Sequence, residues 1–465
     1  EIVSNPESNY QYPYAATEYL KEVVALDENT LQVTMYEALC DSTGYLTYLN
    51  PGLPAHIYGD YELADLEGVI NPEITSGAFQ LGEWRQAELV ALTGWDGYPD
   101  AALGYVNPDG IVQLVVADQT VMLEQFLAPS GAINVVEGPP PDRKQDIRDA
   151  SDAGTHQLYT FTPGDSWDYM GYNTADPTNP QPGLDADGNH IDQGYHPVFS
   201  DKLVRQALAH AVDVDSIVAG AVFGEGSRMP AHIPPGSWAY NDELTPRAYD
   251  SAVALELLAE AGWVPENADE APSLDNPLVC QGCLYAVEVD PEFEGEPFEF
   301  ELVTNAGNTR REAIGTIIQD QLADIGINVD FQTIEFNTLI DVVFGTQQFD
   351  AYILGWRAGY PDAPDTTQLF GASSDDPEAT GSNTTSFYNE AYYELETQAL
   401  TVPGCDQEAR AAIYREMQEI MYDEMPYMWL YVQDGMYAAR SSIEGFSPYP
   451  QLLYWNVDAW SVAGE

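Results

Sequence analysis

Two loops in the second half of the chain carry side chains suited to gripping a solute. They span residues 304–308 and 355–362, and each follows an apolar segment that we predict to be a strand. Their candidate contact residues are Asn305, Asn308, Trp356, Arg357, Tyr360 and Asp362. Amides donate and accept hydrogen bonds, an indole offers an apolar plane, and a guanidinium offers a fork of donors. Because open α/β sheets bind ligands at the carboxyl ends of their strands, the pattern predicts noncovalent capture.

Motifs that mark common enzymes are absent from the sequence. It contains no Gly-x-Ser-x-Gly, His-Glu-x-x-His or P-loop pattern, and the six histidines are scattered. The sequence Gly224-Glu225-Gly226 lacks the later glycine of a dinucleotide-binding loop, because Met229 stands there. The 76 acidic residues still leave open a chance pair of carboxylates that hydrolyses glycosides. We therefore expect no enzyme, with a carboxylate-dependent glycoside hydrolase as an alternative.

One acidic loop is a weak candidate for a metal site. Asp185, Asp187 and Asn189 have the spacing of the first half of a calcium-binding loop. However, the glycine stands at the fourth position of that loop instead of the sixth, and its last position is His196 instead of glutamate. An Asp/Gly-rich turn is the simpler interpretation. We expect no metal and no cofactor.

The composition excludes several classes of partner. The 465 residues, 45% of them apolar, suffice for two or three domains with cores of their own. Seventy-six acids against fifteen bases give a formal net charge of −61, which repels nucleic acid and anionic lipid. No run of eighteen apolar residues encodes a membrane span. The polar start, residues 1–5, lacks the basic part of a signal peptide, so we expect a mature or truncated form.

The four cysteines predict disulfides and no zinc site. Cys280 and Cys283 stand two residues apart in an irregular segment, whereas Cys40 and Cys405 are single, so no second pair completes a zinc site. In an exported protein the simplest interpretation is structural disulfides. The close pair could bridge to itself, or one member could reach Cys405.

The elements that must position the two loops follow from hydrophobic periodicity. Residues 20–36 predict a hairpin, and 118–126 predict a helix before a strand at 133–136. In the second half, residues 201–212 predict a helix, and Asp213 and Asp250 are each predicted to cap the start of another helix. Residues 298–331 predict a strand, then a helix over 309–325, then a second strand parallel to the first. A last strand over 349–354 leads into the Gly355-Trp356 loop.

The order of several short motifs resembles a known family. The motifs are Tyr172-Asn173-Thr174, the helix-forming stretch 196–213, Pro234-Pro235-Gly236-Ser237-Trp238 and Gly355-Trp356. Together they resemble the oligopeptide- and dipeptide-type solute-binding proteins of bacterial ABC importers, family 5. The resemblance implies an α/β fold of the periplasmic-binding-protein-like type II (class C), with two lobes, mixed sheets and a hinge. It places the remainder of lobe I at 1–165, lobe II at 166–430 and the return to lobe I at 431–465.

The same resemblance implies an extracellular, periplasmic or cell-surface receptor. Such a receptor captures an oligopeptide or similar small solute between its lobes and delivers it to an ABC transporter permease. The resemblance also adds Tyr172, Asn173, Trp238 and Asn383 to the candidate ligand contacts.

Two departures from the family pattern qualify these expectations. The resemblance to peptide-binding members implies an aspartate three residues after the tryptophan, and this aspartate pairs with the ligand's α-amino group. In the present sequence that position is Gly359. An oligosaccharide ligand is therefore an alternative. In addition, the family's N-terminal part of lobe I has no counterpart, so we expect either that this chain is a fragment or that a separate chain supplies the missing part.

Overall fold

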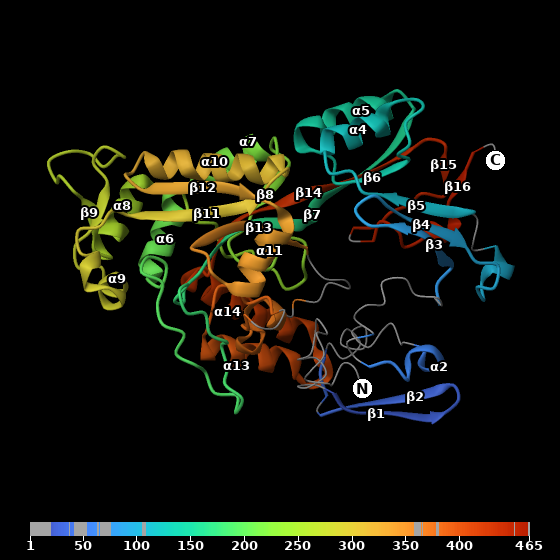
Figure 1. Ribbon diagram of the computed structural model, residues 1–465, viewed down its shortest axis with the longest axis horizontal. Coiled ribbons are helices and arrows are strands. Elements are labelled where there is room, and N and C mark those ends of the chain that lie inside the picture. The colour runs from blue at the N-terminus through green and yellow to red at the C-terminus, as the bar shows by residue number, and fades with distance from the viewer. Residues whose placement is uncertain are drawn as a thin grey trace. The chain divides into compact units, whose positions relative to one another are not determined.

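The chain divides into two compact units in the computed structural model (Figure 1). Unit 1 comprises residues 1–49 and 165–433, and unit 2 comprises residues 50–164 and 434–465. The structure describes residues 20–36, 38–40, 54–62, 65, 76–104, 108–357, 364, 366–377, 381–450 and 452–463. Two long strands, β7 (His156–Tyr172) and β14 (Tyr427–Arg440), carry the chain from one unit into the other.

A mixed sheet forms the centre of unit 1. Its strands follow the order β12 (Asn328–Ile334), β11 (Glu299–Asn305), β13 (Ala351–Arg357), β7 and β14, and β8 (Gly226–Arg228) pairs with β14. Strand β11 is parallel to both of its neighbours, β12 and β13, and β7 runs antiparallel to β13. Strand β13 is largely apolar and buried, and β11 buries Phe300, Leu302 and Val303, which agrees with the strands predicted over 298–302 and 349–354.

The predicted strand–helix–strand unit is present. Helix α10 (Thr309–Ala323) joins β11 to β12 and packs along both strands (Figure 1). It begins where Asn308 accepts a hydrogen bond from the Arg311 amide, and it ends before Gly326, which adopts the left-handed conformation that favours glycine. Its buried side chains include Ile314, Ile318 and Leu322, at the spacing of one helix face.

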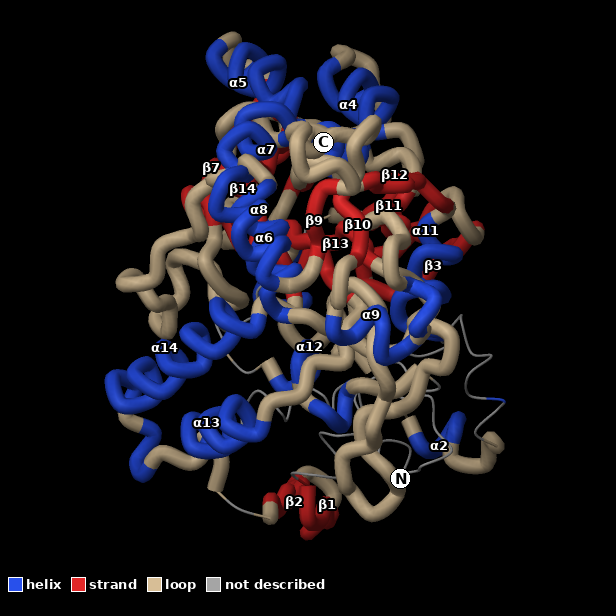
Figure 2. Tube along the Cα trace, turned by 90° about the vertical axis from the view of Figure 1, so that its left-hand side faces the viewer, coloured by secondary structure: helices blue, strands red, loops and turns tan. Residues whose placement is uncertain are grey.

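Three further predicted helices surround this sheet, and each begins at an aspartate. They are α6 (Lys202–Ala211), α7 (Val214–Ala221) and α8 (Ser251–Glu260), capped by Asp201, Asp213 and Asp250. Each cap carboxylate accepts hydrogen bonds from free amides of the first turn. This capping explains why the predicted helix starts agree with the observed ones. Helices α13 (Glu390–Leu400) and α14 (Gln407–Glu424) lie side by side in both views (Figure 2).

The remaining elements of unit 1 are short. They are the hairpin β1 (Leu20–Asp27) and β2 (Thr30–Met35), the pair β9 (Trp263–Pro265) and β10 (Leu278–Cys280), helices α9 (Leu284–Val289), α11 (Phe336–Ile340) and α12 (Thr367–Phe370), a π-helical segment η5 (Asp341–Thr346), and 3₁₀ turns η4 (Pro291–Phe293), η6 (Ala372–Ser374) and η7 (Pro403–Cys405). The hairpin predicted for residues 20–36 is thus confirmed.

Unit 2 has its own small core. It contains α2 (Ala55–Tyr58), the antiparallel strands β3 (Phe79–Arg85), β4 (Leu89–Gly94) and β5 (Gly110–Leu114), helices α4 (Gln119–Leu127) and α5 (Lys144–Asp152), strands β6 (Val135–Glu137), β15 (Ile443–Glu444) and β16 (Ser461–Val462), and 3₁₀ turns η2 (Ala101–Leu103), η3 (Pro141–Arg143) and η8 (Val457–Ala459). Strand β6 pairs with the far half of β14. The predicted helix at 118–126 and strand at 133–136 are both present.

The cysteines form two disulfides. Cys280 bridges to Cys283, which is one of the two arrangements left open by the sequence. Cys40 pairs with Cys405 across 365 residues of sequence, an arrangement that the spacing alone did not suggest. A backbone hydrogen bond from the Cys40 amide to the Leu400 carbonyl oxygen, 2.8 Å long, accompanies this bridge. The segment around Cys40 is therefore fastened to the α13 end of unit 1.

Candidate functional site

The two predicted loops leave the same edge of the unit 1 sheet. Strands β11 and β13 are parallel neighbours, with Leu302 opposite Ala351, so their carboxyl ends lie together. Asn305 ends β11 and Arg357 ends β13. We call this the β11–β13 edge: Asn305, Gly355, Trp356, Arg357 and the first turn of α10.

A buried aspartate from β7 connects the components of this edge. Asp168 lies opposite Gly355 in the sheet and is 2% exposed. Its carboxylate pairs with Arg310 Nε at 2.8 Å and with Arg311 Nε at 3.3 Å. Arg311 also donates from Nη1 to Asn305 Oδ1 over 2.8 Å. Asp168 therefore joins the end of β11, the start of α10 and the end of β13.

The electrostatics of this cluster keep Asp168 ionised. Burial alone would raise the pKa of Asp168, but the charges of Arg310 and Arg311 outweigh burial and hold its pKa below the usual value. The Tyr431 hydroxyl also donates to Asp168 Oδ2 over 2.8 Å. Burial acts to lower the pKa of Arg310, and the Asp168 carboxylate raises it above its ordinary value. The cluster thus buries two guanidinium groups with one carboxylate.

Gly355 is required by the approach of Asp168. A Cβ atom at residue 355 would lie 2.7 Å from Asp168 Oδ1 and 2.7 Å from the Trp167 carbonyl oxygen. Both distances are shorter than real Cβ contacts, and neither atom can move away easily because each belongs to the packed neighbouring strand. Glycine before the tryptophan therefore lets β7 carry its carboxylate up to the edge.

The Trp356 ring is fixed among neighbouring aromatic side chains. The indole nitrogen is buried, and the side chain as a whole is half-buried. Its ring is parallel to that of Tyr169, with centroids 6.5 Å apart, and meets Phe344 of the π-helical segment edge to face at 6.0 Å. These rings hold the indole plane in one orientation, which suits stacking against an apolar or sugar-like surface.

Arg357 is the most accessible of the charged groups at the edge. Its guanidinium pairs through Nε with Asp165, and 40% of its side chain is exposed. Asn308, by contrast, uses its side-chain oxygen to cap α10. The candidates Tyr360 and Asp362, together with Gly359, lie outside the described residues, so their part in the site stays a prediction.

Four further candidates are not brought to this edge. Tyr172 pairs with Ala351 at the opposite end of β13, and the next residue, Asn173, donates its amide to the Gln347 and Phe349 carbonyl oxygens. Asn383 is fully buried and donates to three carbonyl oxygens of its surrounding loops. Trp238 packs against Tyr414. Packing or backbone hydrogen bonds engage these four side chains within unit 1, and their role as solute contacts stays a prediction.

The weak calcium candidate forms a self-contained turn. The Asp185 carboxylate accepts hydrogen bonds from the Asp187 and Asn189 amides, at 2.9 and 2.8 Å, and from the Asn189 side chain. These bonds lower the pKa of Asp185, with the Asn189 amide contributing most. Across the described parts of the chain, no group of three or more His, Cys, Asp or Glu side chains is placed to hold a metal ion.

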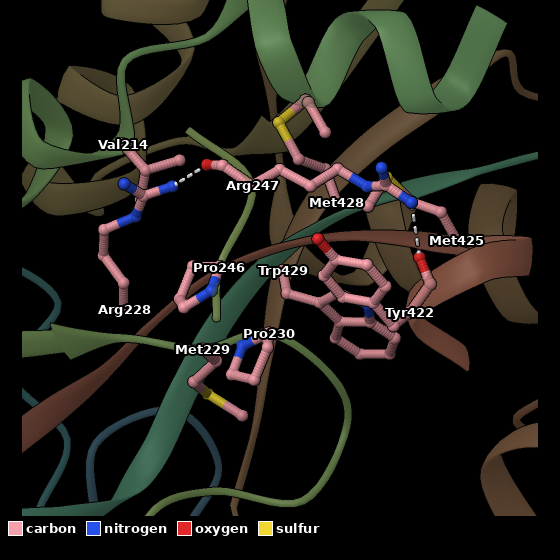
Figure 3. Close-up of a pocket in the computed structure, with 11 residues that line it drawn as sticks. Val214, Arg228, Met229, Pro230, Pro246, Arg247, Tyr422, Met425, Met428 and Trp429 are labelled. Atoms are coloured by element: carbon pink, nitrogen blue, oxygen red, sulfur yellow. Dashed lines mark hydrogen bonds between the residues drawn. The ribbon is translucent and has the colours of Figure 1, made fainter. Parts of the chain in front are cut away.

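A small pocket of unit 1 lies apart from the predicted residues (Figure 3). It is lined by Ala209, Val214, Arg228, Met229, Pro230, Pro246, Arg247, Tyr422, Met425, Met428 and Trp429. Arg228 donates to the Arg247 carbonyl oxygen, and Arg247 donates over 3.0 Å to that of Tyr422. Figure 3 shows the two guanidinium groups turned to different carbonyls, so they do not form a common anion site.

Sequence reasoning missed the residues that organise the edge. Asp168, Arg310, Arg311 and Tyr431 come from three separate segments, and only their pairing in the sheet brings them together. One signal was available: two adjacent arginines occupy the first turn of α10, where the helix dipole favours acidic residues. In a chain with fifteen basic residues, that placement indicates a specific acidic partner.

Comparison with known sequences identifies the family of this chain. Residues 1–378 match the model of the bacterial extracellular solute-binding proteins, family 5 Middle. The chain is 29% identical over 419 residues to the oligopeptide-binding protein AppA of Bacillus subtilis, covering 88% of this chain and 66% of that relative. It is 23% identical over 437 residues to the dipeptide-binding protein of Escherichia coli, covering 92% and 69%. The chain thus spans about two thirds of the length of these relatives.

Solved structures have the same fold. The oligopeptide-binding protein AppA from Bacillus subtilis in complex with a nonapeptide matches with a TM-score of 0.78 and 26% identity, over 99% of this chain and 82% of that one. NikZ from Campylobacter jejuni in complex with Ni(L-His) matches with a TM-score of 0.76 and 19% identity, over 98% and 82%. At that identity the second likeness concerns the fold alone.

Proposed function

This chain belongs to family 5 of the bacterial extracellular solute-binding proteins, and from that premise we propose that it captures a small solute for an ABC importer. Its fold is the two-unit α/β fold of the type II periplasmic binding proteins, as the resemblance predicted. The relatives are binding proteins and not enzymes, so the glycoside hydrolase alternative is not supported.

The observation that carries the proposal is the convergence at the β11–β13 edge. Asn305 and Trp356 lie at the ends of strands β11 and β13, about fifty residues apart in sequence, and the Asp168–Arg311 pair joins these strands at one edge. An amide, an oriented indole face and a partly exposed guanidinium are the groups needed to hold a polar solute. We propose Asn305, Trp356 and Arg357 as solute contacts, with Tyr360 and Asp362 on the same loop.

We propose a peptide or similar small solute as the ligand class. The similarity to AppA, whose structure contains a nonapeptide, supports a peptide. Gly359 stands where peptide-binding members carry the acid that meets the α-amino group, and this favours a ligand held without such an anchor. A neutral oligosaccharide is the second candidate, because the Trp356 ring face suits sugar stacking.

The partner would be an ABC transporter permease, and the site of action outside the cytoplasmic membrane. No described helix has the length and apolar character required to cross a bilayer. Whether the protein acts in a periplasm or at a cell surface stays part of the proposal. A separate chain that completes lobe I also stays a prediction, without support from the comparisons.

Native mass spectrometry of the purified protein, followed by calorimetry, tests the proposal. We would titrate synthetic di- to nonapeptides and, in parallel, linear oligosaccharides, and assay each for breakdown. Binding of peptides without turnover supports the proposed function, and binding of oligosaccharides alone selects the second candidate. Turnover of any of these compounds, or no binding to any of them, contradicts a receptor for these solutes.

A further inference from the structure

The strands β7 and β14 cross from one unit to the other at residues that bond to the β11–β13 edge. The unit 1 residue next to the crossing is Asp165 in β7 and Gln433 in β14. Arg357 pairs with Asp165, and Arg310 donates from Nη1 to Gln433 Oε1 over 3.0 Å. Each side of the β11–β13 edge therefore bonds directly to the end of one connection.

The two connections are also joined to each other through the same cluster. Strands β7 and β14 are neighbours in the sheet, and the Tyr431 hydroxyl of β14 donates to Asp168 of β7 over 2.8 Å. Asp168 in turn holds Arg310 and Arg311. One buried carboxylate of the β7 connection thus accepts bonds from the edge and from the β14 connection.

We propose that Asp168 is a positioning residue that couples the β11–β13 edge to the two connecting strands. A solute that shifts Asn305 changes the position of Arg311, which holds Asp168, and a solute that shifts Arg357 acts on Asp165 through a partly exposed pair. Because the buried pairs of Asp168 tolerate little separation in a medium of low polarity, this carboxylate moves with its partners. Occupancy of the edge is thereby transmitted to residues 165–168 and 431–433.

The burial of the cluster explains why this transmission is specific. Asp168 is 2% exposed, so water cannot replace an arginine that moves away. Because residue 355 is a glycine, Asp168 lies directly against the backbone of β13, with no side chain between them. By comparison, the Lys202–Asp423 pair of the same unit lies at the surface, with side chains 39% and 58% exposed, and its partners can separate into water.

Coupling between two places is reciprocal, so it can be tested from either end without a solute. The inference extends the proposed function, but its test is independent of ligand identity. Tyr431→Phe removes one hydroxyl on the connecting strand, and Arg357→Ala removes one side chain at the edge. Asp423→Asn is the matched control, because it weakens an ion pair of unit 1 outside the cluster.

Hydrogen exchange measured by mass spectrometry on the full chain gives the readout. Tyr431→Phe should raise exchange severalfold in residues 304–311 and 354–357, and Arg357→Ala should do so in residues 431–433. Asp423→Asn should change neither region. Exchange in α13 serves to show that a variant has not simply lost overall stability. If Tyr431→Phe changes only β14, or if both variants alter all regions alike, the coupling is absent.

A failure of the proposed function would appear separately. If the wild-type protein binds no peptide or oligosaccharide but the exchange responses occur, the coupling stands and the ligand class is wrong. If peptides bind and Tyr431→Phe leaves the edge unchanged, the receptor stands and the coupling is overturned.

Discussion

Two buried aspartates of unit 1 have opposite electrostatic environments. Asp168 is surrounded by two arginines and a tyrosine hydroxyl, and its pKa is lowered despite burial. Asp375 is equally buried at 2% exposure, but its oxygens accept from the amides of Gln193 and Gln347, at 2.8 and 3.1 Å. Burial raises the pKa of Asp375 to about 6, because amide donors offset burial only in part.

The difference shows how burial and partner type together decide a charge state. Full positive charges keep the edge cluster ionised throughout the neutral range, so it is suited to fixed positioning. Neutral amides leave Asp375 poised to gain a proton, so the loop that supplies Gln193 is held by a contact that depends on pH. The same side chain therefore serves as a rigid anchor in one region and as a titrating one in the other.

Removing the carboxylate at the edge should have the largest effect. Asp168→Ala leaves Arg310 and Arg311 buried without a counter-charge, and we expect a loss of about 3–5 kcal/mol in the free energy of unfolding. Urea denaturation at neutral pH measures this loss. Asp375→Asn is the matched control, because it removes a charge that burial already disfavours. A similar loss in both variants would contradict the comparison.

The stability of the two sites should depend on pH in opposite ways. The folded pKa of Asp375, about 6, exceeds its ordinary value of 3.8, so its contribution is fully present below pH 3.8 and is lost as the pH rises through about 6. A difference of about two pKa units corresponds to about 3 kcal/mol. Denaturation curves of wild type and Asp375→Asn between pH 4 and 7 should diverge by an amount of this order.

Asp168 supplies the opposite sign in the same experiment. Its lowered pKa means that its contribution is present above its ordinary value and is lost as the pH falls through its folded pKa. The free energy of unfolding of Asp168→Asn should therefore no longer fall at acidic pH through this group. The change in that free energy near pH 6, which comes from Asp375, should remain. Disappearance of the change near pH 6 in this variant would show that the two sites titrate as one.

Solute affinity should depend on the edge and not on other aromatic side chains of unit 1. Trp356→Ala should weaken binding of the solute identified by calorimetry about tenfold or more, because an oriented ring is lost from the contact surface. Trp238→Ala is the control, since Trp238 packs on Tyr414 away from the edge. Unchanged affinity in Trp356→Ala would place the solute elsewhere.

The smallest effect on stability should come from the exposed ion pair at the edge. Arg357→Ala removes the pairing with Asp165, and a partly exposed pair of this kind contributes less than about 1 kcal/mol. Thermal denaturation should therefore shift little, whereas solute affinity should fall, because Arg357 is proposed as a contact. A large loss of stability without a loss of affinity would reassign Arg357 to a structural role.

Local elements were predictable wherever neighbouring residues determine them. Asp201, Asp213 and Asp250 each bond to amides two or three residues ahead, so these three helix starts followed directly from the sequence, whereas the capping role of Asn308 did not. The parallel order of β11 and β12 also followed, because a helix joins them. The partner of Cys40 did not, because Cys405 lies 365 residues away.

The candidate site was predictable only in part. Asn305 and Trp356 could be assigned to one edge, because both were expected just after strands of one sheet, although the structure places them in the last residues of those strands. Asn173 and Asn383 were indistinguishable in sequence from solute contacts, and only their surroundings show that backbone carbonyls use their amides. Polar residues in loops serve either purpose, and burial decides between them.

The amino-acid order alone determined several helices and strands of unit 1, the resemblance to the family and the two segments that meet at the sheet edge, since periodicity, capping and motif order act over short distances along the chain. The folded chain alone decided that Asp168 from β7, Arg310 and Arg311 from α10 and Tyr431 from β14 share one buried cluster. The physical reason is that a buried charge is tolerated only where distant segments supply its counter-charges, and those segments meet only through the pairing of strands.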